Sequence, residues 1–345
     1  MNFRTISYLL GRLFCIVAVS MAVPAYVSYR YNEIFQLHAF YKSIAVTLII
    51  GGLMMYINRK YKNDLIRTRD GFLLVTLTWF FMSIFGALPF YWSGFFNGFV
   101  DCFFESASGF TTTGASVLTD IEALPYGLLF WRSLTQWIGG LGIVVLAVAI
   151  LPQLSVGGMQ LMKNEMPGPT FEQLKPRIRQ TAISLWKIYV LFSVVLLVIL
   201  YSLGMPVFDS FCHVFSTLST GGFSTQNNSI AGYSTEIQMV MSFFMFLGGC
   251  NFVLHYAWLH GDFKTLFKNE EFRFFVTFLT VVILAISVDL IFRIHVSVLE
   301  AFRLTIFQVA SMASSTGFAT TDFNQWPALS KGIIFLLMFV GGCAG

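Results

Sequence analysis

The chain has 345 residues, of which 56% are hydrophobic and only 11% are charged. A soluble domain of this length carries about a quarter charged residues, because its surface must be hydrated. The low charge and the 39 Phe residues therefore exclude an ordinary soluble enzyme, a nucleic-acid-binding protein and a disordered scaffold. The five Cys stand singly in apolar stretches, which predicts neither a disulfide framework nor a zinc site.

Eight apolar stretches of about 20 residues are long enough to cross a hydrocarbon core about 30 Å thick. They are residues 7–29, 38–57, 71–92, 126–151, 181–204, 235–259, 273–292 and 327–345. Lys and Arg gather near the start of the first span, at Arg4 and Arg12, and in the alternate connections 58–70, 152–180 and 260–273. Because basic loops stay in the cytoplasm, the sequence predicts an all-α polytopic membrane protein of about eight transmembrane spans with a cytoplasmic N-terminus.

A polar tract that contains glycine recurs after the third, fifth and seventh spans, each time behind an apolar run of about ten residues that is too short to cross the bilayer. The three copies, 101–116, 209–224 and 304–319, align on Gly114, Gly222 and Gly317. Equivalent positions hold equivalent residues: Ser108, Ser216 and Ser311 six before the glycine, Thr112, Thr220 and Ser315 two before it, and Glu105, His213 and Gln308 nine before it. The pattern predicts an internal repeat of a span, a re-entrant pore helix, a loop and a second span.

The physics of this unit indicates an ion path. Non-helical backbone at membrane depth must be buried in protein or line a water-filled cavity. A short helix that enters from outside directs the negative end of its dipole toward that cavity, and Asp101 and Asp209 are expected to cap the opposite ends. Glycine adopts positive φ at no steric cost, and a ring of carbonyls replaces the hydration shell of an alkali cation. The expected K⁺-binding filter is Thr112, Thr113, Gly114, Thr220, Gly221, Gly222, Ser315, Thr316 and Gly317.

Structural roles compete with functional ones at several positions. One Thr-Thr-Thr-Gly tract alone is more often a loop or a helix cap, and only its threefold recurrence favours a filter. The pairs Gly139–Gly140, Gly248–Gly249 and Gly341–Gly342 fit either close packing of spans or a gating bend. Residues 105, 213 and 308 are expected to hold the short helices rather than bind ions. Arg132 is expected to contact a pore loop or a lipid headgroup.

Several tracts strongly resemble the potassium-uptake subunits of the Trk/Ktr/HKT superfamily. They are FFESASGFTTTGASVL (103–118), QWIGGLGIVVLAVAILP (136–152), GGMQLMKNEMPGP (157–169), FSTLSTGGFST (215–225), STGFATTDFNQWP (315–327) and GGCAG (341–345). The resemblance implies two leading helices at 1–57 and M1–pore helix–M2 units at 58–151, 152–259 and 260–345. It also implies a homodimer in the bacterial inner membrane, with cytoplasmic TrkA-like nucleotide-binding subunits as partners.

The same resemblance assigns roles to single positions. The family's filter glycines match Gly114, Gly222 and Gly317, and a glycine rather than a serine at the first favours K⁺ over Na⁺. The tract Gly341, Gly342, Cys343, Ala344 and Gly345 would begin a gating loop below the filter. The family pattern has four units, whereas this sequence holds three, the third ending within its own M2. We therefore expect that residues 1–345 alone do not conduct K⁺ selectively.

The leading functional hypothesis is thus the membrane subunit of a K⁺ uptake system. K⁺ would be the transported ion, no cofactor would be covalently bound, and the contacts would be with membrane lipid and protein partners rather than nucleic acid. A Na⁺ or weakly selective cation transporter remains an alternative, as does a truncated subunit that associates without conducting. The sequence has no HExxH motif, intramembrane carboxylate pair or phosphate-binding loop, which disfavours an enzyme.

Overall fold

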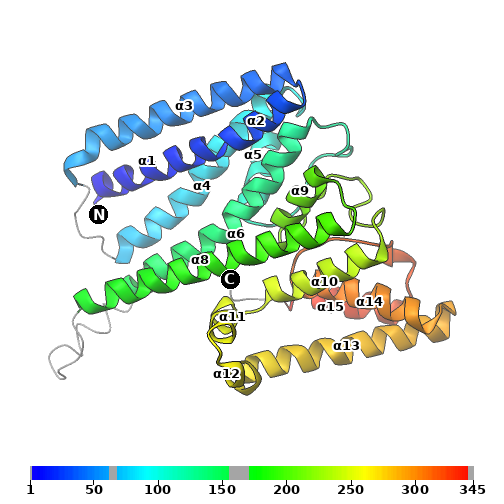
Figure 1. Cartoon of the computed structure of the whole chain (residues 1–345). Helices are drawn as coiled ribbons and strands as arrows, with labels where there is room; N and C mark the ends of the chain where they lie inside the picture. Colours follow the sequence, from blue (N-terminus) through cyan, green and yellow to red (C-terminus); the bar gives the residue numbers. More distant parts are fainter. Residues whose placement is uncertain (1, 62–67, 155–170, 341–345) are drawn as a thin grey trace. The chain divides into compact units, whose positions relative to one another are not determined.

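The computed structural model describes residues 2–61, 68–154 and 171–340, and every regular element in these ranges is a helix (Figure 1). The expected all-α fold is confirmed. Within these ranges, five helical stretches are long and apolar enough to cross a membrane: Phe3–Arg30, Ile34–Tyr61, Arg69–Ser93, Ile183–Ser202 and Glu270–Ile294. The chain divides into two compact units, Met1–Thr111 with Ala115–Trp186, and Thr112–Gly114 with Lys187–Gly345. The predicted total of about eight spans stays a prediction.

The first unit begins with helices α1 (Phe3–Ser20), α2 (Ala22–Arg30) and α3 (Ile34–Asn58). Helices α1 and α3 pack together where two glycines face each other. A Cβ on Gly11 would lie 2.7 Å from the carbonyl oxygen of Gly51, and one on Gly51 would lie 2.8 Å from that of Gly11. Small residues allow this approach of two backbones, as is common between membrane helices.

The predicted first span is interrupted at Met21, between α1 and α2. Pro24 causes the interruption, because it has no N–H to donate to the carbonyl four residues earlier. The amide N–H groups on either side keep the helical pattern: Met21 donates to Val17 at 3.1 Å, and Ala25 donates to Met21 at 3.1 Å. Helices α1 and α2 therefore follow one another with helical hydrogen bonds on both sides, and the missing bond is the one that Pro24 cannot donate.

The rest of the first unit surrounds the short helix α5 (Phe99–Phe110) with α4 (Thr68–Ser93) and α6 (Tyr126–Leu154). Two glycines allow the close contacts. A Cβ on Gly86 of α4 would collide with the ring of Phe110, and one on Gly139 of α6 would collide with the backbone of Phe110. Gly139 is therefore a packing position within a continuous helix.

The second unit contains α9 (Val207–Leu218), α10 (Thr235–Gly249), α11 (Phe252–Leu259) and α12 (Phe263–Lys268), together with α8 (Phe171–Ser202) from Lys187 on. The predicted span 235–259 is not one continuous helix, because the helix ends at Gly249 and restarts at Phe252. Cys250 is extended, with φ −88° and ψ 155°. His255 Nε2 lies 2.9 Å from the carbonyl oxygen of Leu247, which partly replaces the hydrogen bonds lost at the break.

Helices α13 (Glu270–Ile294), α14 (Val298–Ala313) and α15 (Ala328–Leu337) share a second apolar core with the one-turn helix η2 (Phe323–Gln325) beside it. Asp289 of α13 fixes the start of α15, since its Oδ2 accepts hydrogen bonds from the Ser330 N–H at 3.2 Å and the Ser330 hydroxyl at 2.6 Å. Helix α15 covers the beginning of the predicted span 327–345.

Candidate functional site

Each glycine tract follows the C-terminal end of a short helix. Helices α5, α9 and α14 end at Phe110, Leu218 and Ala313. Their first turns hold Asp101, Asp209 and Glu300, which face the positive end of the helix dipole. The prediction that Asp101 and Asp209 act as caps is wrong: the N-cap residues are Gly98 and Pro206, and the Asp209 carboxylate instead accepts a hydrogen bond from Thr225 Oγ1 at 2.7 Å.

The backbone of the three tracts repeats one conformation. In each copy the glycine and the residue two before it are left-handed, and the residue between them is not. The φ angles are 53° and 76° at Thr112 and Gly114, 53° and 76° at Thr220 and Gly222, and 62° and 80° at Ser315 and Gly317. Threonine rarely adopts positive φ, so the surrounding structure imposes this conformation.

Hydrogen bonds explain which way the carbonyls turn. In the second copy the N–H groups of Gly221 and Gly222 both donate to the carbonyl oxygen of Ser216, at 2.9 and 3.3 Å. In the third copy the N–H groups of Thr316 and Gly317 donate to Ser311 at the same two distances. The C=O and N–H of a trans peptide point in opposite directions. The carbonyls of residues 220, 221, 315 and 316 therefore all point away from the helix ends.

The glycines bring the tracts into contact. A Cβ on Gly114 would collide with the carbonyl oxygen of Gly221, and one on Gly222 would collide with that of Thr316. A Cβ on Gly317 would meet no described atom within 4 Å. Each of the first two glycines thus leaves room for a carbonyl of the next copy, and the nine predicted filter residues form three adjoining segments.

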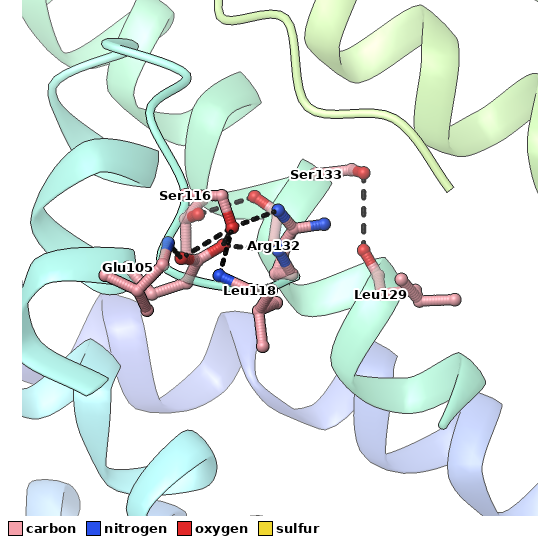
Figure 2. Close-up of polar contacts among 8 residues, drawn as sticks. Glu105, Ser116, Leu118, Leu129, Arg132 and Ser133 are labelled. Carbon is pink, nitrogen blue, oxygen red and sulfur yellow. Dashed lines mark hydrogen bonds and ion pairs between the residues drawn. The ribbon is translucent and has the colours of Figure 1, made fainter. Parts of the chain in front are cut away.

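A buried ion pair holds the loop directly after the first tract (Figure 2). Arg132 Nε on α6 lies 2.7 Å from Glu105 Oε1 on α5, and both side chains are buried. The Glu105 carboxylate also accepts hydrogen bonds from the Ser116 hydroxyl at 3.0 Å and from the Val117 N–H at 3.2 Å. The expected structural roles of Glu105 and Arg132 are confirmed by these contacts.

The second copy has an equivalent contact with different chemistry. His213 on α9 is buried, and its Nε2 lies 3.1 Å from Ser224 Oγ. Ser224 stands two residues after its glycine, as Ser116 does in the first copy. In these two copies, the side chain nine residues before the glycine therefore braces the hydroxyl two residues after it.

The third copy departs from this pattern. Position 319 is alanine, and the buried amide of Gln308 has no hydrogen-bond partner among the described residues. The expectation that Gln308 holds its helix by a hydrogen bond is thus not met there. The predicted gating-loop residues 341–345 lie outside the described residues.

The sequence alone identified the glycines but missed two features of the site. The first is the left-handed conformation of Thr112, Thr220 and Ser315, whose only sequence signal is their repeated position. The second is the serine two residues after the glycine, Ser116 or Ser224. The aligned sequences show this serine, but they do not show its contact with the side chain nine residues before the glycine. The second Gly-Gly pair also differs from the first, because Gly248 and Gly249 end a helix.

The sequence of residues 36–345 matches the TrkH family, which is described as cation transport protein. Trk system potassium uptake protein TrkH of Salmonella typhimurium is 41% identical, and the match covers 100% of this chain and 72% of that protein. The TrkH protein of Halomonas elongata is 40% identical with the same coverage. Trk system potassium uptake protein TrkG of Escherichia coli is 37% identical, covering 99% of this chain and 71% of that one.

The crystal structure of the potassium transporter TrkH from Vibrio parahaemolyticus has a similar fold. Its TM-score is 0.89 at 36% sequence identity, and the match covers 100% of this chain and 71% of the other. Both the family match and the relatives span most of the chain, and five of its helical stretches are apolar enough to cross a membrane. The chain is a multi-pass membrane protein that belongs to the TrkH family of cation transport proteins.

Proposed function

We propose that this chain is the membrane subunit of a potassium uptake system. K⁺ would pass a filter made of backbone carbonyls from the three tracts: Thr112, Thr113, Gly114, Thr220, Gly221, Gly222, Ser315, Thr316 and Gly317. The observation that carries the proposal is the alternation of positive and ordinary φ in all three tracts, which in the second and third accompanies hydrogen bonds that turn successive carbonyls to one side. Such carbonyls replace the hydration shell of a potassium ion.

The surroundings of the filter support a cation rather than an anion. Three short helices end at the tracts, and a helix C-terminus carries about half a negative charge. None of the nine filter residues has a charged side chain, so selectivity would rest on backbone dipoles. The names of the Salmonella and Halomonas relatives point to the same ion.

The assembly is part of the proposal. The names of the relatives refer to a Trk system, which is in keeping with a multi-component transporter. We extend this to a homodimer with TrkA-like nucleotide-binding subunits, in the inner membrane, with the N-terminus in the cytoplasm. The gating role of Gly341, Gly342, Cys343, Ala344 and Gly345 belongs to the same proposal. A transport family of this kind is not a family of enzymes.

The test compares Gly114→Ser with Gly52→Ser. The protein is expressed from its own gene, read to the stop codon, and K⁺ and Na⁺ fluxes are measured in liposomes. Gly114 has positive φ and lies against the Gly221 carbonyl, whereas a Cβ on Gly52 would meet nothing within 4 Å. We expect Gly114→Ser to raise Na⁺ flux relative to K⁺ flux and Gly52→Ser to leave the ratio unchanged. A wild-type protein that prefers Na⁺ would favour the sodium alternative, and one without flux would favour a non-conducting subunit.

A further inference from the structure

His213 contacts more than its own filter segment. Its Nδ1 lies 2.8 Å from the carbonyl oxygen of Asp209. A carbonyl only accepts, so Nδ1 carries the proton and Nε2 faces Ser224 Oγ at 3.1 Å. The ring is thereby fixed at both nitrogens, directly behind the second tract.

Ser224, which contacts His213, also contacts the loop that follows it. Its Oγ lies 3.1 Å from the backbone oxygen of Ser229, and it accepts a hydrogen bond from the Gln226 N–H at 3.1 Å. A hydroxyl has one proton, and the unprotonated Nε2 of His213 takes it. The bond that joins Ser224 to the loop is therefore the one that its Oγ accepts from the Gln226 N–H. The turn depends on Ser229 itself, which is left-handed with φ 57°.

The same loop holds the third tract. The Ala319 N–H donates to Ser229 Oγ at 3.2 Å, and the Ile230 N–H donates to the Ala319 carbonyl oxygen at 3.2 Å. The His213 ring also packs on Phe318, with ring centroids 6.0 Å apart. The two residues that follow Gly317 are thus contacted by His213 of the second copy and by the loop that comes after that copy.

Among the described residues, the third copy lacks the hydrogen bond that joins the side chain nine residues before the glycine to the residue two after it. Gln308, the counterpart of His213, is buried without a hydrogen-bond partner among the described residues, and Ala319 lacks the hydroxyl that Ser116 and Ser224 supply. The side-chain contact from within the copy is instead the Ser311 hydroxyl, which donates to the Phe318 carbonyl oxygen at 2.6 Å. Residue 319 therefore depends on the loop that Ser224 and His213 support.

We propose that His213 is a positioning residue for two filter segments at once. It holds the second through Ser224, and it holds the third through its contact with Phe318 and through the loop 226–229, which Ser224 binds at Gln226 and which binds Ala319 from Ser229. The inference rests on the proposed function only in its consequence, which is that loss of His213 loosens two sides of the carbonyl cage. A looser cage adapts to the smaller Na⁺ and discriminates less against it.

Four variants of the protein expressed from its own gene separate this role from a general structural one. His213→Met removes both nitrogens, whereas His213→Gln keeps an amide that reaches toward Ser224. Ser229→Gly removes only the hydroxyl that binds Ala319, and glycine suits the positive φ there. Gln308→Met is the matched control at the same position of the third copy, where no hydrogen bond is lost.

Two measurements are made on each variant: hydrogen–deuterium exchange of segments 220–225 and 316–320, and the K⁺/Na⁺ flux ratio in liposomes. We expect His213→Met to speed exchange in both segments by about two- to tenfold, the range that one hydrogen bond is worth. Ser229→Gly should affect only 316–320, and Gln308→Met neither segment. The flux ratio should fall with His213→Met and recover with His213→Gln.

Each outcome decides a separate point. Faster exchange in 220–225 alone would overturn the link to the third segment, and so would an increase spread over the whole chain. Exchange as expected with an unchanged flux ratio would overturn the role in selectivity. If the wild-type protein carries no K⁺, the proposed function fails, while the exchange data still decide whether His213 holds both segments.

Discussion

Glu105 and Arg132 form an ion pair that is 0% and 1% exposed, with Arg132 Nε 2.7 Å from Glu105 Oε1. The Glu105 carboxylate also accepts hydrogen bonds from the Ser116 hydroxyl and the Val117 N–H. The ion pair therefore joins α5, α6 and the loop after the first tract. Removing one member of such a pair leaves a buried, uncompensated charge.

Arg132→Met should therefore destabilise the protein by about 3–5 kcal/mol. The double variant Glu105→Leu with Arg132→Met, which leaves no charge behind, should recover much of that loss. Unfolding in detergent, followed by the temperature at which monodisperse protein disappears, measures both. A double variant no more stable than Arg132→Met would show that the hydrogen bonds to residues 116 and 117, rather than the charge balance, dominate.

The next prediction separates backbone strain from steric collision at Gly222. Gly222 has φ 76° and a Cβ there would collide with the Thr316 carbonyl oxygen, whereas Gly204 has φ 91° with nothing within 4 Å. Gly204→Ala should cost only the left-handed strain, about 1–2 kcal/mol. Gly222→Ala should in addition displace the third segment and abolish K⁺ flux. Equal flux in the two variants would contradict the close approach of the second and third tracts.

The lengths of the apolar stretches were enough for the all-helical fold and for the three short helices, because a run of about ten apolar residues before a polar glycine tract is a local signal. The break at Cys250 was only one of two interpretations of the Gly248–Gly249 pair, since apolar residues continue on both sides of it. Only the structure shows that Gly139 packs within a helix while Gly249 ends one. Two identical dipeptides thus differ through their neighbours rather than through their own preferences.

The site was predictable to the level of the glycines and no further. Positive φ at glycine follows from its missing Cβ, but the same conformation at Thr220 arises because the next two N–H groups are held by Ser216. The contact of His213 with Phe318 joins residues far apart in the chain, and no spacing rule reveals it. Neither the backbone hydrogen bonds to Ser216 nor the ring contact with Phe318 follows from the propensity of single residues, which accounts for both omissions.

The loop before α15 should respond to acid. The Asn324 N–H donates to Asp322 Oδ1 at 3.0 Å, and this hydrogen bond lowers the pKa of the carboxyl below its ordinary value of 3.8. A lowered pKa means that the ionised form stabilises η2 at pH above 3.8 and that this contribution is lost as the pH falls through the lower folded value.

Hydrogen–deuterium exchange of residues 323–326, corrected for the intrinsic rate, should therefore speed up as the pH falls below 3.8. Asp322→Asn keeps an acceptor for the Asn324 N–H but does not titrate, so its corrected exchange should stay constant over the same range. A parallel acid response in the variant would assign the effect to other groups.

Ala319→Ser should complete the missing brace of the third copy. Serine at this position reproduces the arrangement of Ser116 and Ser224, and the buried Gln308 amide offers both a donor and an acceptor. A hydrogen bond that satisfies a buried polar group contributes about 0.5–1.5 kcal/mol, so the variant should unfold at a higher temperature than the wild type. The gain should disappear in Ala319→Ser with Gln308→Met, because the hydroxyl then lacks its partner. If the stabilisation persists in that double variant, the hydroxyl has formed a hydrogen bond elsewhere. The contact between the side chain nine residues before the glycine and the serine two after it then does not extend to the third copy.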